Sequence, residues 1–142
     1  TMPRVKIEVP KTFHFTTEIP IRISDINYGG HLGNDSVLSI LHEARIRMLM
    51  EYGWTEMNIE GVSVIMSDSV VLYKSQAFYG ESLRIQIAVK DFSNFGCDIY
   101  YLVRERESGR EVARAKTGIA FFNYEEQKLS AVPDNFKKQF LS

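Results

Sequence analysis

The sequence predicts an α+β fold in which one long helix packs against an antiparallel sheet. Two changes in the spacing of apolar residues indicate this class: the period is two from Phe13 to Ile23, becomes 3.6 after Asn34, and returns to two after Gly61. A helix with one apolar stripe and a sheet with one apolar face bury each other as two layers. The length fits one domain over residues 1–142.

The first segment, Phe13 to Ile23, is rich in β-branched and aromatic residues, which predicts a strand. Pro20 lies within this segment and favours an edge position or a bend, because proline cannot donate a hydrogen bond to the sheet. The following residues, Asp25 to Asn34, are mostly turn formers. They predict an irregular loop between the strand and the helix.

The helix is predicted to begin after this loop and to end near Gly53. Asn34, Asp35 or Ser36 is predicted to cap it. The residues expected on its buried face are Val37, Leu38, Leu41, Ala44, Arg45, Met48 and Tyr52. The opposite face is polar, so a single stripe is expected to be buried.

Four further strands follow in the alternating part of the sequence. Their predicted ranges are Val62 to Tyr73, Ser82 to Phe92, Cys97 to Glu105 and Glu111 to Asn123. Short turns join them, and this order favours an antiparallel meander. A short helix is predicted from Pro133 to Leu141. About five strands around one helix leave sheet edges uncovered, so we expect a homodimer or homotetramer.

The composition excludes several classes of function. With 17 Lys+Arg against 18 Asp+Glu, the formal net charge is −1, and no basic stripe suggests a nucleic-acid partner. No window approaches the roughly 20 apolar residues of a membrane span. The charged segment Thr1 to Pro10 is not typical of a secretory signal, so a cytoplasmic location is expected. The single cysteine, Cys97, is expected to pack as a small hydrophobe, and no metal-ligand spacing is seen.

The loop D-I-N-Y-G-G-H-L-G-N, from Asp25 to Asn34, precedes a helix that carries H-E-A-R-I-R. In these motifs, and in its order of elements from Phe13 to Asn123, the chain resembles the 4-hydroxybenzoyl-CoA thioesterase-like branch of the hotdog superfamily. The resemblance implies a hotdog fold, with a long central helix wrapped by a curved antiparallel sheet. It also implies dimers or tetramers with active sites between subunits and without a metal.

The activity implied by the resemblance is hydrolysis of a fatty or aromatic acyl-CoA thioester to the free acid and CoA. No cofactor is implied, because coenzyme A is part of the substrate. An acyl carrier protein thioester is the alternative substrate. Two other functions remain open: an acyl-CoA-binding module without chemistry, and a hotdog hydratase or dehydratase. Fold alone does not decide among these functions.

The match to the family loop has two departures. Asn27 stands where several members carry the catalytic carboxylate, and Gly29 stands where relatives carry Asn. His31 and Asn34 match the family pattern. The resemblance therefore supplies a catalytic carboxylate in the loop only if Asp25 fills that role.

Thioester hydrolysis needs a base or nucleophile and a group that polarises the carbonyl. We predict Asp25 as the carboxylate, although an aspartate in a turn also commonly binds loop amides. His31 carries an imidazole that can donate or accept a proton, and it is predicted to orient Asp25, to polarise the carbonyl or to protonate the leaving thiolate. Asn27 is predicted to hold a water or the carbonyl oxygen, or simply to adopt a turn conformation.

Substrate binding is predicted at Gly29, Gly30 and Asn34. Glycines allow close approach of the main chain and leave N–H groups free, and the helix N-terminus adds donors. Glu43 is the reserve carboxylate, but its position four residues before Arg47 suits an exposed ion pair.

The rest of the substrate would contact apolar and cationic side chains. Candidates for an acyl pocket are Tyr28, Met66, Phe78, Tyr79 and Phe95, and candidates for the coenzyme A phosphates are Lys74, Lys90, Arg104 and Arg114. The sequence does not choose among them.

Overall fold

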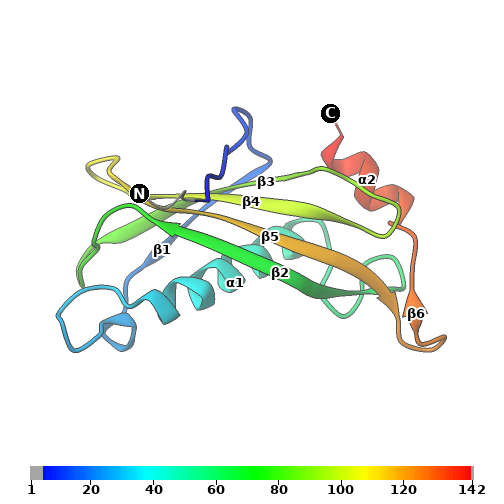
Figure 1. Ribbon diagram of the computed structural model, residues 1–142, viewed down its shortest axis with the longest axis horizontal. Helices are drawn as coiled ribbons and strands as arrows, with labels where there is room; N and C mark the ends of the chain where they lie inside the picture. Colours follow the sequence, from blue (N-terminus) through cyan, green and yellow to red (C-terminus); the bar gives the residue numbers. More distant parts are fainter. Residues whose placement is uncertain (1–4, 142) are drawn as a thin grey trace.

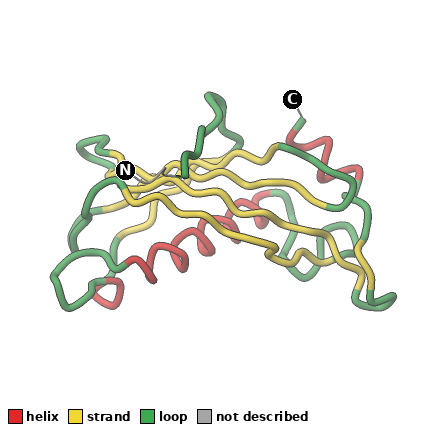
Figure 2. The backbone as a smooth tube through the Cα atoms, in the orientation of Figure 1, coloured by secondary structure: helices red, strands yellow, loops and turns green. Residues whose placement is uncertain are grey.

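Residues 5–141, which the computed structural model describes, form two layers (Figures 1 and 2). A curved antiparallel sheet is the first layer, and the long helix α1 lies along its concave face as the second. The elements in chain order are β1 (Phe15–Pro20), η1 (Ile23–Asp25), α1 (Asn34–Glu51), β2 (Ser63–Tyr73), β3 (Ser82–Lys90), β4 (Gly96–Glu105), β5 (Glu111–Asn123), β6 (Lys128–Leu129) and α2 (Asp134–Phe140). The predicted helices and long strands are all present, while η1 and β6 were not predicted.

The strand order is β1-β3-β4-β5-β2, and β6 pairs with β5. Strands β3, β4 and β5 form the predicted meander, but the prediction is wrong for β2. This strand pairs with β5, because the second edge of β3 is taken by β1. Residues 74–81 therefore cross one end of the sheet between β2 and β3. Pro20 ends the edge strand β1, as its chemistry predicts.

The core lies between α1 and the sheet. The buried residues of α1 are Val37, Ile40, Leu41, Ala44, Arg45, Met48 and Leu49. Leu38, predicted on this face, is 47% exposed, so that prediction is wrong. The face is centred on Leu41, Ala44 and Met48, and Leu38 lies beyond its edge.

A smaller apolar cluster covers part of the convex face of the sheet. Ile7 is buried there against Ala88 and Tyr100, and Val70 and Leu72 pack beside it. Residues 5–8, here called the N-terminal strap, thus lie on the side of the sheet opposite α1 (Figure 1). The Arg114 guanidinium donates a 2.9 Å hydrogen bond to the Ile7 carbonyl and fixes the strap to β5.

The two ends of the molecule differ. At one end, Phe136 and Phe140 of α2 pack with Trp54 and Phe121 in an aromatic cluster. The loop between η1 and α1 lies at the other end, beside the end of β2 (Figure 1). Within residues 5–141, no helix is long and apolar enough to cross a membrane.

Candidate active site

The loop that leads into α1 folds back on itself as a small hairpin. Ile26 and Leu32 form a β-bridge, and the Gly33 N–H donates a 3.0 Å hydrogen bond to the Asp25 carbonyl. The Leu32 N–H also donates to the Ala77 carbonyl at 2.7 Å. This last bond joins the loop to the segment after β2, which is distant in sequence.

Asn27 holds the tip of this hairpin. Its side-chain oxygen accepts hydrogen bonds from the N–H groups of Gly29 (2.9 Å) and His31 (3.4 Å), and its carbonyl accepts one from Gly30 (3.0 Å). The expectation that Gly29 and Gly30 leave their N–H groups free is therefore wrong, because Asn27 uses both. Gly30 has a φ of +85°, a conformation that favours glycine.

The N-cap of α1 is Gly33, and no side chain caps the helix, so the predicted cap at Asn34, Asp35 or Ser36 is wrong. A Cβ atom at Gly33 would stand 2.6 Å from Oδ1 of Asp35, so a larger residue there would require the Asp35 side chain to move. The main-chain N–H groups of Asn34 and Asp35 have no hydrogen-bond partner among residues 5–141. They are donors at the positive end of the helix dipole, suited to an oxyanion.

His31 and Asn34 line a cavity of about 240 Å³, here called the His31 cavity. Its other lining residues include Tyr73, Lys74, Gln76 and Val112. The Nδ1–H group of His31 donates a 3.2 Å hydrogen bond to the Leu32 carbonyl oxygen. With Nδ1 engaged, Nε2 is the nitrogen available for chemistry.

Asp25 is only 4% exposed, and its carboxylate faces Arg22. The Arg22 N–H donates to Oδ2 at 2.9 Å, and the Arg22 guanidinium lies 3.3 Å from Oδ1. The hydrogen bond to Asp25 raises the pKa of Arg22. Asp25 thus binds a main-chain amide. No hydrogen bond joins it to His31 within the described chain, and it does not line the His31 cavity.

Glu43 forms the predicted exposed ion pair, with 2.8 Å between its Oε2 and Nε of Arg47. It lines a separate cavity of about 260 Å³ between β1 and α1, together with Arg22 and Ser39. The reserve carboxylate Glu43 therefore lies apart from the His31 cavity within this chain.

Sequence reasoning missed the far wall of the His31 cavity. Tyr73 donates a 3.3 Å hydrogen bond to the Asn34 carbonyl, and Gln76 lies beside it in the segment after β2. No local signal marks these residues, because a long-range pairing brings them to the loop. The five predicted acyl-pocket residues do not line this cavity, and each is at least 41% exposed.

Cys97 is buried, and burial raises the pKa of its thiol to about 12. At neutral pH it is not a thiolate nucleophile, in agreement with the predicted packing role. Among residues 5–141, no group of three or more His, Cys, Asp or Glu side chains is arranged to hold a metal ion.

A family model described as the thioesterase-like superfamily matches residues 21–140. The chain belongs to this superfamily. A comparison with curated protein sequences finds no significant match.

Solved structures of thioesterases share the fold of this superfamily member. A 1,4-dihydroxy-2-naphthoyl-CoA thioesterase from Synechocystis is 20% identical, with a TM-score of 0.81 over 89% of this chain and 94% of that one. A DHNA-CoA thioesterase from Staphylococcus aureus is 18% identical, with a TM-score of 0.77 over 88% and 87%. A further S. aureus protein, solved in complex with CoA, is 15% identical, with a TM-score of 0.80 over 94% and 85%. The fold is therefore a hotdog, which confirms the resemblance.

Proposed function

We propose that this superfamily member hydrolyses an acyl-CoA thioester at the His31 cavity. The observation that carries the proposal is the presence of His31 and the uncapped N-terminus of α1 in one cavity. A thioester carbonyl placed there meets the N–H group of Asn34, which lines the cavity at the start of α1 and stabilises negative charge on the carbonyl oxygen. Membership of the superfamily supports the same class of reaction.

The proposed reaction uses a water molecule as the nucleophile. Because Asp25 does not line the His31 cavity, it takes a proton from this water through a second, bridging water, and a C–O bond forms at the carbonyl carbon. The C–S bond then breaks, and His31, which carries protons on both ring nitrogens at the start of the reaction, gives its Nε2 proton to the departing thiolate. The proton held by Asp25 returns to His31 through solvent, which restores both groups.

Asp25 is the proposed carboxylate because it is the buried acid of the loop. Its Oδ2 is occupied by the Arg22 N–H, whereas Oδ1 has only the 3.3 Å contact with the Arg22 guanidinium. Because the Arg22 side chain is 69% exposed, it is free to swing away and leave Oδ1 for water. We assign Asn27 to positioning, since its amide oxygen holds the hairpin.

We also propose a homodimer built along β2. This strand has 11 residues and lies at the edge of the sheet, where its outer hydrogen-bonding groups have no neighbouring strand in this chain. Met66 and Tyr73 on it are exposed apolar residues. A second copy would cover this edge on both sides of the register irregularity between Met66 and Asp68.

The test of the activity is a thiol-release assay over short, long and aromatic acyl-CoAs, with His31→Gln beside the wild type. We expect release from at least one substrate class and a loss of turnover of about 10²–10⁴-fold in the variant. If a folded wild-type protein releases thiol from none of them, the proposal is wrong and the chain is a binding module.

A further inference from the structure

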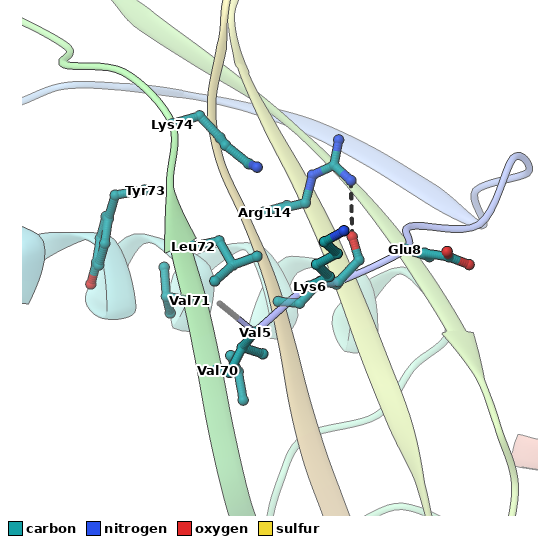
Figure 3. Close-up of a pocket in the computed structure, with 10 residues that line it drawn as sticks. Val5, Lys6, Glu8, Val70, Val71, Leu72, Tyr73, Lys74 and Arg114 are labelled. Carbon is teal, nitrogen blue, oxygen red and sulfur yellow. Dashed lines mark hydrogen bonds between the residues drawn. The ribbon is translucent and has the colours of Figure 1, made fainter. Parts of the chain in front are cut away.

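A cavity lies on the convex face of the sheet, under the N-terminal strap. It has a volume of about 720 Å³ and is here called the strap cavity. Val70 and Leu72 of β2 lie on its floor, and Val5 of the strap lies across from them (Figure 3). Two residues, Tyr73 and Lys74, line both this cavity and the His31 cavity. The two spaces are therefore neighbours around the end of β2.

The rim of the strap cavity is cationic. Figure 3 shows Lys74, Arg114 and Lys6 extending toward one end of the cavity, whereas Glu8 extends away from it. Lys6 and Lys74 form no ion pair with any of residues 5–141. Arg114 is paired with Glu111 at 2.7 Å, whereas Lys6 and Lys74 remain without a direct ion-pair partner beside an apolar floor. An anion with an apolar or aromatic part is the complementary ligand.

Resting on the proposed thioesterase function, we propose that the strap cavity binds the adenosine 3′-phosphate end of coenzyme A. The thioester end of the same molecule then occupies the His31 cavity, and the pantetheine arm passes Tyr73 and Lys74. The phosphates meet Lys6 and Lys74, and the adenine lies on the apolar floor. An acyl carrier protein carries no adenosine, so the cavity selects free coenzyme A thioesters.

A ligand in the strap cavity would not block the proposed dimerisation along the β2 edge. Val70 and Leu72 belong to the cluster on the convex face, so their side chains project from the sheet and not along its plane. The strap is held by the burial of Ile7 and by the bond from Arg114 to the Ile7 carbonyl. Substitution of Lys6 or Lys74 leaves both anchors intact, so a variant retains the shape of the cavity.

The test uses the double variant Lys6→Gln/Lys74→Gln and the control Lys138→Gln, an exposed lysine in α2 at the other end of the molecule. Calorimetry measures the binding of adenosine 3′,5′-bisphosphate. We expect the double variant to bind it about tenfold more weakly or worse, and the control to match the wild type. Equal affinity in the double variant, or no binding to the wild type, would overturn the proposal.

A second readout separates this proposal from the thioesterase function. For the best acyl-CoA, we expect the double variant to raise KM about tenfold with little change in kcat, and to leave hydrolysis of the matching acyl-pantetheine unchanged. An equal rise of KM for both substrates would contradict the proposal while leaving the activity established. If no thioester is hydrolysed, the calorimetric test still decides whether the cavity binds the nucleotide.

Discussion

The Arg45 guanidinium, on the buried face of α1, donates a 3.0 Å hydrogen bond to the hydroxyl of Tyr101 on β4. The same guanidinium pairs with Glu56 at 2.7 Å, and the Tyr101 hydroxyl also meets Thr117 at 2.8 Å. Arg45 and Tyr101 are both buried, so this network ties the helix to the sheet through the core. A buried charge of this kind is costly unless every partner stays in place.

Arg45→Met is therefore expected to lower the free energy of unfolding by about 3 kcal/mol, because it leaves Tyr101 and Glu56 without their donor. Tyr101→Phe is expected to cost about 1–3 kcal/mol. Urea unfolding followed by circular dichroism measures both. The matched control is Arg104→Met at an exposed position of β4, where a change within about 0.5 kcal/mol is expected. An Arg45 variant as stable as this control would contradict a structural role for the network.

The pH dependence of stability is expected to include a contribution from His14. Its Nδ1 accepts a 3.0 Å hydrogen bond from the Val89 N–H, and its ring packs edge-on against Phe140. Burial lowers the pKa of His14 below the ordinary value of 6.5. The unfolded chain therefore binds a proton at His14 more readily than the folded chain does. The contribution of neutral His14 to the free energy of unfolding is complete above the ordinary pKa of the unfolded chain, and it is lost as the pH falls through the lowered pKa of the folded chain.

Urea unfolding between about pH 8 and pH 5 measures this dependence, since a histidine titrates in that range. His14→Asn keeps an acceptor for Val89 but does not titrate, so its stability should vary less over the same range. If the free energy of unfolding of the wild type varied with pH no more than that of the variant, His14 would not be the source of the pH dependence.

The choice between the two candidate carboxylates is open to a direct comparison. Asp25→Asn is expected to reduce kcat by about 10²–10⁴-fold, since an amide is not a base. The fold should persist, because the amide oxygen can still accept the hydrogen bond from the Arg22 N–H. Glu43→Gln, which breaks only an exposed ion pair with Arg47, should leave kcat nearly unchanged. Steady-state thiol release measures both variants, and the reverse ranking would move the catalytic role to Glu43.

The proposed dimer predicts that light scattering at micromolar concentration finds twice the monomer mass. Met66→Lys places a charge on the exposed β2 edge and should shift the population toward monomer. A lysine at the equally exposed Phe95, in the turn between β3 and β4, is the control and should remain dimeric. A wild-type protein that is a clean monomer would contradict the dimer along β2.

Several elements could be predicted from local sequence alone. Strand β5 was predicted with the bounds that the structure shows, because its alternation is regular and a tight Ser108-Gly109 turn precedes it. The two short elements, η1 and β6, could not be predicted from local sequence. Three residues form η1 because Asp25 turns back to the Arg22 N–H, and β6 exists only because two residues pair with the end of β5. Such contacts leave no periodic pattern in the sequence.

The sequence by itself determined the order of the elements, the buried face centred on Leu41 and Ala44, and the loop that carries His31. These follow from the spacing of apolar residues and turn formers, which are local properties of the chain. Only the tertiary structure decided that β2 pairs with β5, that Gln76 and His31 line one cavity, and that Lys6, Lys74 and Arg114 share another. Such pairings join residues far apart in sequence, and the packing of the whole sheet selects them.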